Sequence, residues 1–244
     1  MSAEPEQTPA QQAHRLVAVV VTHDRLAQLQ TTLDALLATP PEDLCAVVVV
    51  DNASTDGTQT WLADQTDPRL DVLRHDRNLG GAGGFENGMK RAMETHAPDW
   101  VVVMDDDARP APGTLHGFLA TDRGAADAWA AAVRHPDGRI CDINRPSINP
   151  FWNRAAFLRT AVGGGREGFH LMPEDYDTDA LRAVDAASFV GLFLSADAIR
   201  RIGYPDGRLF VYCDDVLYTL KLRRAGGHIE PNDGGDAALK YQWK

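Results

Sequence analysis

Residues 100–107 read WVVVMDDD, so that five apolar residues lead directly into three carboxylates. A short, continuous apolar run predicts a strand that is buried on both faces, as in a parallel sheet. Two further valine-rich runs, residues 16–21 and 46–50, come earlier in the chain. The sequence therefore predicts three strands of a buried sheet, and one of them ends in a cluster of acids.

Helices are predicted between these strands. Leucines recur at helical spacing after Asp24, and Pro40 ends that pattern. A second helix is expected from Ser54 or Asp56 to about residue 65, and a third begins near the glycines at 80–84. A short strand at 71–74 lies between them. This alternation predicts an α/β sheet with right-handed crossovers.

The second half of the chain is less regular. Strands are predicted at 188–194 and 209–212, and helices at 196–201 and 216–224. Prolines and glycines interrupt residues 144–185, which predicts a mobile loop. Its aromatic residues either fix the loop to the core or contact a substrate; they are Phe151, Trp152, Phe169 and Tyr176. Residues 1–13 are polar and are expected to form a disordered tail.

Composition limits the classes of function. The 244 residues carry a net charge of −11, and no basic stripe suited to a nucleic-acid backbone is present, so we expect no nucleic-acid partner. The three cysteines are far apart and odd in number, which indicates a reduced, cytoplasmic compartment. No apolar run approaches the roughly 18 residues of a membrane span, and no signal-peptide pattern is present.

The acid triplet is the strongest candidate site. Ligands of open α/β sheets bind at the carboxyl ends of strands. If the backbone stays extended, Asp105 and Asp107 point the same way and Asp106 points opposite. Two converging carboxylates suit Mg²⁺ or Mn²⁺. The alternative is a turn with Asp107 near a helix cap, but three buried like charges are costly without a cation, which favours the metal.

Two other polar segments follow predicted strands. Asp51 is placed to accept a hydrogen bond from the imide N–H of uracil or thymine, although turn and cap chemistry explains the same segment. The glycines of residues 77–85 would let the backbone approach a ligand, and a helix N-terminus there favours an anion. Glu86 excludes a dinucleotide fingerprint, and Met89 before Lys90 excludes a P-loop.

A last acidic pair, Asp214 and Asp215, opens the final predicted helix. A carboxylate beside a sugar hydroxyl can act as a general base. An acidic first turn that complements the helix dipole explains the pair equally well.

Together these segments resemble the inverting GT-A glycosyltransferases of family 2, from about residue 16 to residue 227. The glycine segment narrows the resemblance to bacterial galactofuranosyltransferases and rhamnosyltransferase-like members. The resemblance implies a GT-A fold, with a mostly parallel central sheet flanked by helices. Residues 14–244 would form one catalytic domain, with a nucleotide-sugar-binding half (14–110) and an acceptor-side half (111–244).

The resemblance also implies roles for individual residues. Asp215 would be the general base, with Asp214 as its neighbour, and Asp105 and Asp107 would bind the metal. The remaining predicted contacts are with the nucleotide-sugar donor, and they are Thr22, Arg25, Asp51, Arg77, Asn78, Gly81, Asp105 and Asp106.

The activity implied is inverting transfer of galactofuranose from UDP-galactofuranose, with Mn²⁺ or Mg²⁺, to a cell-surface glycan or a polyprenyl-linked acceptor. Such an acceptor implies peripheral association with the inner face of the plasma membrane. The family often has a third acid where Leu217 stands, and a late histidine near residues 241–244; His228 comes too early for it. Two alternatives therefore stay open: a dTDP-rhamnose-dependent transferase, and an impaired or truncated nucleotide-binding module.

Overall fold

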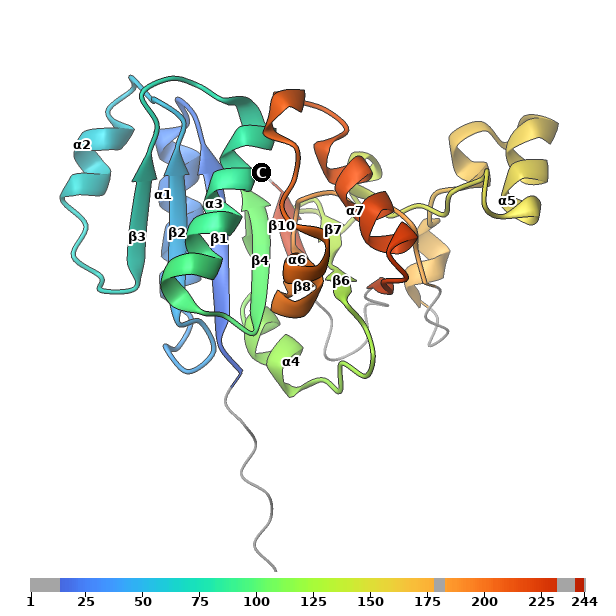
Figure 1. Ribbon diagram of the computed structural model, residues 1–244, viewed down its shortest axis with the longest axis horizontal. Helices are drawn as coiled ribbons and strands as arrows, with labels where there is room; N and C mark the ends of the chain where they lie inside the picture. The colour runs from blue at the N-terminus through green and yellow to red at the C-terminus, as the bar shows by residue number, and fades with distance from the viewer. Residues whose placement is uncertain (1–13, 178–182, 232–239, 244) are drawn as a thin grey trace, which may run out of the picture.

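A seven-stranded sheet organises the protein in the computed structural model, which describes residues 14–177, 183–231 and 240–243 (Figure 1). The strand order is β3-β2-β1-β4-β8-β6-β9. The first four of these are mutually parallel, and β8 is antiparallel to β4. The expected mostly parallel sheet is therefore confirmed. Its strands are β1 (Leu16–Thr22), β2 (Ala46–Asp51), β3 (Leu70–Arg74), β4 (Trp100–Asp105), β6 (Ala128–Ala130), β8 (Leu192–Ser195) and β9 (Ile229–Pro231).

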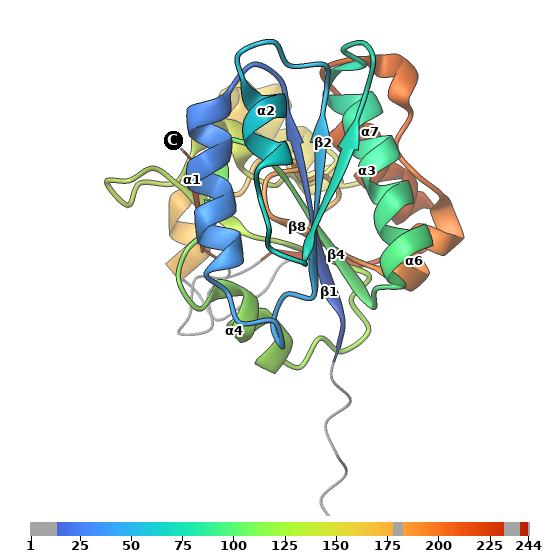
Figure 2. The same cartoon turned by 90° about the vertical axis from the view of Figure 1, so that its left-hand side faces the viewer.

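Helices cover both faces of this sheet. Figure 2 shows α1 and α2 on one side and α3, α6 and α7 on the other. All five helices lie where the sequence predicts them, whereas the short α4 was not predicted. The helices around the sheet are α1 (Leu26–Leu37), α2 (Thr58–Ala63), α3 (Gly80–His96), α4 (Thr114–Ala120), α6 (Ala196–Ile202) and α7 (Asp214–Arg224).

The strand side chains pack into two apolar cores, one on each face of the sheet, because successive side chains of a strand point to opposite faces. In β1, Val19 packs in the core beneath α3, and Val20 packs in the core beneath α1. The close approach of α3 requires glycine, since a Cβ atom at Gly88 would lie 2.5 Å from Val19 Cγ1. A Cβ atom at Gly84 would lie 2.5 Å from Val21 Cγ1. Part of the glycine segment therefore serves helix packing.

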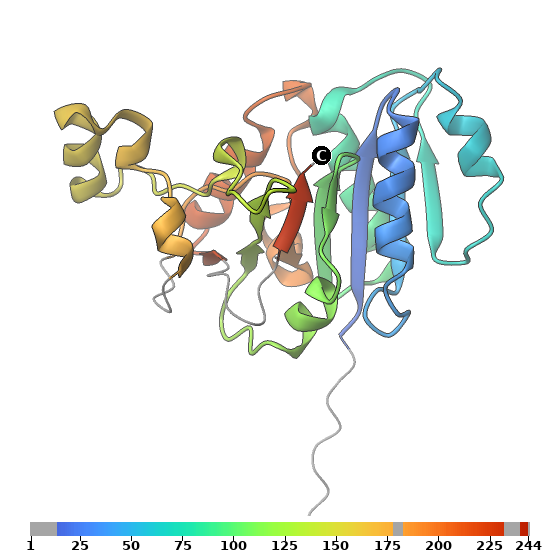
Figure 3. The same cartoon turned by 180° about the vertical axis from the view of Figure 1, so that it is seen from behind.

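A second sheet has the strand order β5-β10-β7. Its strands are β5 (Ala108–Pro110), β7 (Ala132–Arg134) and β10 (Lys240–Trp243). Each has only three or four residues, too few for a periodic pattern, and none was predicted. β10 pairs antiparallel with β5, with Trp243 opposite Ala108. The end of the chain thereby lies beside the segment that follows the acid triplet, as the red strand in Figure 3 shows.

The stretch from 144 to 185 is more structured than predicted. Beside the 3₁₀ turn Asp142–Asn144 it contains α5 (Arg154–Arg159), a π-helical turn (Thr160–Gly164) and the 3₁₀ turns Gly165–Gly168 and Pro173–Asp177. Ser147 forms bridges with His170 and Ala186. Of its aromatic residues, Tyr176 is buried in the core and Phe151 is exposed. These helical turns were not predicted, because each is too short to show a period.

The predicted strand at 209–212 was also wrong. The chain forms a 3₁₀ turn (Gly207–Leu209) and then takes left-handed backbone angles at Phe210 (φ 62°), Tyr212 (φ 73°) and Cys213 (φ 65°). The apolar side chains that suggested a strand are exposed instead. The strand predicted at 188–194 begins only at Leu192.

Candidate active site

Three polar strand ends meet at one edge of the large sheet. Thr22 at the end of β1 is in register with Asp51 at the end of β2, and Val21 is in register with Asp105 at the end of β4. Parallel strands place their carboxyl ends at the same edge, where ligands of open α/β sheets bind. The sheet topology therefore brings together segments that lie about 30 and 50 residues apart in sequence.

The loops after β1 and β2 are joined by hydrogen bonds. The backbone N–H of Asp24 donates to Ser54 Oγ (3.0 Å), and the N–H of Thr55 donates to the Asp24 carboxylate. Asp51 is almost fully buried, and its Oδ1 accepts from the N–H of Ser54 (2.9 Å). Asp51 Oδ2 accepts no hydrogen bond from the described residues and lies 4.0 Å from Arg74 Nε. One buried acceptor thus remains at this edge for a ligand donor.

The acid triplet does not have the predicted alternating geometry. β4 ends at Asp105, and Asp106 and Asp107 form a turn before β5. Thr22 Oγ1 donates to Asp106 Oδ2 (2.7 Å), and Arg25 Nη1 contacts both Asp106 Oδ1 (3.3 Å) and Asp107 Oδ2 (3.1 Å). The expectation that Asp105 and Asp107 share one face of an extended strand is therefore wrong. Thr22 and Arg25, predicted to contact the donor, both bind the triplet.

Asp105 is the member of the triplet whose carboxylate forms no hydrogen bond or salt bridge with the described residues. Burial and the charges of Asp107 and Asp106 raise the pKa of Asp105 to about 8. The charge of Asp214 adds to this increase. A carboxylate in this environment is stabilised by a cation.

Two residues that were not predicted hold the turn in place. Thr32 in α1 donates its hydroxyl to the backbone carbonyl of Asp106 (2.7 Å). Trp243 in β10 donates Nε1–H to Asp107 Oδ1 (3.1 Å). Trp243 occupies the region where the family resemblance places a late histidine. The place of Trp243 near the expected histidine was the only sequence signal that pointed to this residue. That signal did not predict its hydrogen bond to Asp107.

The glycine segment lies next to the acidic edge. Asn52 donates Nδ2–H to the carbonyl of Gly80 (2.9 Å), and Asn78 Oδ1 accepts from the N–H of Gly80 (2.7 Å). The N–H of Ala82 donates to the carbonyl of Phe210 (3.1 Å). These donors at the start of α3 are thus bound within the protein, which weakens the expectation that this helix end binds an anion.

The other residues of this segment differ in their surroundings. A Cβ atom at Gly81 would meet no atom within 4 Å, so open space adjoins the backbone there. Arg77 is exposed in the turn before α3. Both positions are open to a ligand.

Asp214 and Asp215 form the first turn of α7, next to the loop that contacts the start of α3. Burial raises the pKa of Asp215 to about 6; a hydrogen bond from the N–H of Val216 opposes this increase, and the charge of Asp214 adds to it. Burial also raises the pKa of Asp214. A carboxylate with a pKa near 6 is ionised at neutral pH and is a stronger base than an ordinary aspartate.

The oxygen ligands at this edge fit a metal that is shared with a substrate. The Asp105 carboxylate accepts no hydrogen bond from the described residues, and a carboxylate oxygen is a ligand that both Mg²⁺ and Mn²⁺ accept. No group of three or more His, Cys, Asp or Glu side chains suited to a metal occurs in the described part of the chain. Mg²⁺ and Mn²⁺ are often bound by one or two carboxylates together with substrate phosphates.

His228 lies at the opposite edge of the sheet. Its carbonyl accepts from the N–H groups of Asp127 and Ala128 before β6 begins, and its ring contacts Glu230. Ala128 is in register with Leu194, which in turn is in register with Val101 near the start of β4. His228 is therefore not placed to complete a site at Asp105.

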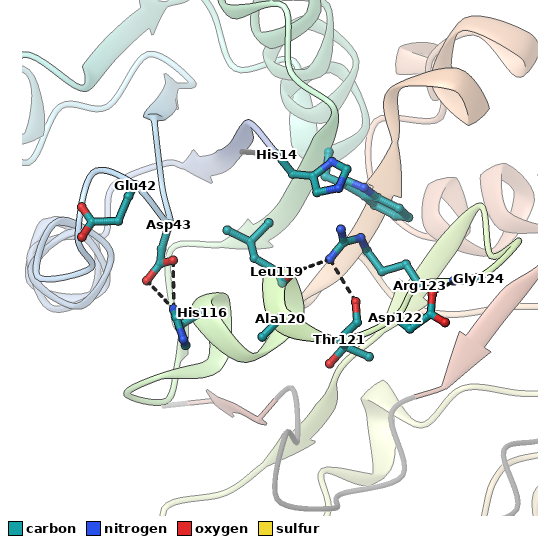
Figure 4. Close-up of a pocket in the computed structure, with 11 residues that line it drawn as sticks. His14, Glu42, Asp43, His116, Leu119, Ala120, Thr121, Asp122, Arg123 and Gly124 are labelled. Atoms are coloured by element: carbon teal, nitrogen blue, oxygen red, sulfur yellow. Dashed lines mark hydrogen bonds and ion pairs between the residues drawn. The ribbon is translucent and has the colours of Figure 1, made fainter. Parts of the chain in front are cut away.

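A cavity of about 800 Å³ also lies away from the acidic edge. It is lined by His14 and Trp100, which stand at the amino ends of β1 and β4, and by residues of α4. Figure 4 shows Asp43 and His116 paired in it, with His116 Nδ1 3.1 Å from the carboxylate. Because the carboxyl ends of the same strands carry the acids, this cavity is separate from the candidate active site.

The fold and the acid-lined strand edge define a GT-A glycosyltransferase. Solved structures with a similar fold include GalNAc-T7 with UDP, GalNAc and Mn²⁺ (TM-score 0.68, 12% identity, 95% of this chain and 44% of that chain). The S. aureus protein TarS with UDP is another (TM-score 0.63, 18% identity, 93% of this chain and 60% of that chain). The sequence matches glycosyl transferase family 2 over residues 17–169, and the chain belongs to this family.

Two relatives with known activities are similar to this chain over most of its length. The galactofuranosyltransferase GlfT1 of Mycolicibacterium smegmatis is 36% identical over 214 residues, which cover 86% of this chain and 65% of that enzyme. The N-acetylglucosaminyl-diphospho-decaprenol L-rhamnosyltransferase of Mycobacterium tuberculosis is 29% identical over 235 residues, 86% of this chain and 71% of the relative. The chain thus spans slightly less than two thirds of the length of the first relative. None of its described helices is long and apolar enough to cross a membrane.

Proposed function

We propose that this protein is an inverting glycosyltransferase that transfers galactofuranose from UDP-galactofuranose to a cell-surface glycan or polyprenyl-linked acceptor. The observation that carries the proposal is that Asp51 and Asp105 end two parallel strands at one sheet edge, and that the charge of Asp214, the neighbour of Asp215, acts on Asp105. The 36% identity to a galactofuranosyltransferase supports the choice of sugar. The names of two relatives, a decaprenol-linked rhamnosyltransferase and an undecaprenyl-phosphate mannosyltransferase, support a lipid-linked acceptor. Such an acceptor would place the enzyme at the inner membrane face.

In this proposal the donor binds along the strand ends. Asp51 Oδ2, which accepts no hydrogen bond from the described residues, accepts the imide N–H of uracil. Gly81 and Arg77 contact the diphosphate and sugar, since both are open to a ligand. Asp105 and Asp107 would bind Mn²⁺ or Mg²⁺, which neutralises the charge that grows on the departing diphosphate.

The acceptor side provides the base. Asp215 removes the proton from the acceptor hydroxyl, and the resulting oxygen attacks the anomeric carbon opposite the diphosphate, so the configuration inverts. Burial raises the pKa of Asp215, and the charge of Asp214 adds to the increase. The protein thus contributes positioning of donor and acceptor together with one tuned carboxylate.

Calorimetric titration with UDP and with dTDP tests this proposal, each with and without Mn²⁺. We expect Mn²⁺-dependent UDP binding that is lost in Asp107→Ala and retained in Asp197→Ala, a control on an exposed acid in α6. Preference for dTDP would favour the rhamnose donor, which the 29% identity to a rhamnosyltransferase makes the second candidate. Nucleotide binding without turnover of any nucleotide sugar would identify a binding module.

A further inference from the structure

Residues 150–166, here called the α5 arm, form a projection from the body of the protein. In Figure 1 the arm stands clear of the sheet at the end of the molecule opposite α2. Its fold is defined by hydrogen bonds: Asn153 Oδ1 accepts from the N–H of Ala156 (3.0 Å), and Thr160 Oγ1 donates to the carbonyl of Ala156 (2.8 Å). The arm is therefore a shaped surface that stands apart from the core.

The arm exposes large apolar side chains. Phe151 is 84% exposed and Val162 is 83% exposed. A hollow of about 530 Å³ opens on the arm, and its lining is mostly apolar. Exposed apolar patches of this kind on a soluble protein mark interaction surfaces. The exposed apolar residues of the arm are Phe151, Trp152, Phe157, Leu158 and Val162.

The charge of the arm is opposite to that of the whole chain. The chain carries −11, whereas residues 150–166 contain Arg154, Arg159 and Arg166 and no acidic residue. None of these arginines forms a salt bridge with a carboxylate of the described residues. Arg159 and Arg166 donate to backbone carbonyls, so their charges are not neutralised. The surface therefore suits a partner that is both apolar and anionic.

The arm is also connected to the proposed general base. Arg224 in the last turn of α7 lies over the ring of Trp152, with Cζ 5.6 Å from the ring centroid. Asp215 is in the first turn of the same helix, nine residues earlier, which corresponds to roughly 14 Å along a helix axis. A surface that holds the arm would thus lie within reach of the acceptor side of the candidate site.

We propose that the α5 arm docks this protein on an anionic lipid bilayer. Its aromatic and aliphatic side chains enter the interfacial region, and its arginines contact the lipid phosphates. Aromatic residues and arginines are the side chains that interfacial segments use in this way. The inference rests on the proposed function, because it names the surface that would hold the enzyme beside a lipid-linked acceptor.

Vesicle sedimentation of the full chain tests the docking surface without an activity assay. We expect binding to phosphatidylcholine vesicles that contain phosphatidylglycerol, weakened by salt, and weak binding to phosphatidylcholine alone. The combined variant Arg154→Gln, Arg159→Gln, Arg166→Gln should bind about a hundredfold more weakly, since each arginine near an anionic surface contributes about fivefold. A matched control removes the same charge elsewhere and should change binding less than about twofold; it combines Arg91→Gln, Arg139→Gln and Arg200→Gln.

A second variant, Phe151→Ser, tests the apolar contribution and leaves the arginines in place. We expect it to weaken vesicle binding by about tenfold or more. Thermal unfolding verifies that each variant is folded. The proposal is overturned if the wild type does not bind the anionic vesicles, if both arm variants bind as the wild type does, or if the arm instead mediates a dimer that Phe151→Ser dissociates. UDP binding measured on the same proteins tests the proposed function separately and should be unchanged in the arm variants.

Discussion

Gly84→Ala should separate the packing role of the glycine segment from its role at the ligand site. The added Cβ atom would lie 2.5 Å from Val21 Cγ1, 3.0 Å from Val21 Cγ2 and 3.1 Å from Asn52 Nδ2. Val21 is β-branched and buried in β1, so it has few alternative rotamers. Overpacking of this kind costs about 1–3 kcal/mol, of which helix propensity returns up to about 1 kcal/mol.

Gly81→Ala is the matched control, because Gly81 lies in the same helix as Gly84. Its added Cβ atom would have no neighbour within 4 Å. We expect the free energy of unfolding of the two variants to differ by about 2 kcal/mol. For a domain of this size the difference corresponds to roughly 4–8 °C in melting temperature, measurable by calorimetry. Gly81→Ala should instead weaken UDP binding, since this glycine adjoins the proposed donor path. Equal melting temperatures would refute the packing account of Gly84.

Three further outcomes follow from the site. The transfer rate at saturating donor should fall about tenfold from pH 7 to pH 5, because burial raises the pKa of Asp215 to about 6 and the base is lost on protonation. Trp243→Phe should weaken Mn²⁺-dependent UDP binding by about tenfold in calorimetry, since it removes the hydrogen bond to Asp107. Thr22→Val should lower the free energy of unfolding by about 1–3 kcal/mol in urea titrations, because Asp106 loses a buried donor.

Each of these outcomes has a control. UDP binding measured across the same pH range separates loss of the base from loss of the donor site, and a flat rate profile from pH 5 to 7 would contradict the assignment of Asp215. Unchanged binding in Trp243→Phe would mean that β10 is not needed at the site. For Thr22→Val, the free energy of unfolding of Thr31→Val provides the comparison, since Thr31 is an exposed residue of α1. Equal free energies of unfolding for these two variants would show that the hydrogen bond from Thr22 to Asp106 does not stabilise the fold.

The buried strands and the main helices were predictable because their signals are local and repeated. Residues 16–21 and 46–50 are uninterrupted apolar runs, and only a strand covered on both faces accommodates them. The glycines of α3 were predicted to lie near a ligand. Whether a given glycine packs against a strand, as Gly84 does, or adjoins open space, as Gly81 does, depends on which strand faces the helix. That information lies in the tertiary structure.

The errors have physical causes of the same kind. Residues 209–212 form a short apolar run that is typical of a strand, yet the backbone φ angle becomes positive at Phe210 and Tyr212, and the side-chain pattern does not record that change. The acid triplet was predicted to extend β4, but its last two residues form a turn. Thr32 in α1 and Arg25, which precedes α1, stabilise this turn by hydrogen bonds. Trp243 was missed because its contact with Asp107 joins residues 136 positions apart.

We propose Asp215 as the general base for inverting sugar transfer from a nucleotide donor bound at the strand ends. The most direct test is nuclear magnetic resonance of the product formed from UDP-galactofuranose, Mn²⁺ and a polyprenyl-linked acceptor, for the wild type and for Asp215→Asn. The account predicts a glycoside of inverted anomeric configuration from the wild type. It predicts a loss of rate of at least about a hundredfold in the variant, with UDP binding retained. A product of retained configuration, or equal rates from both proteins, would contradict it.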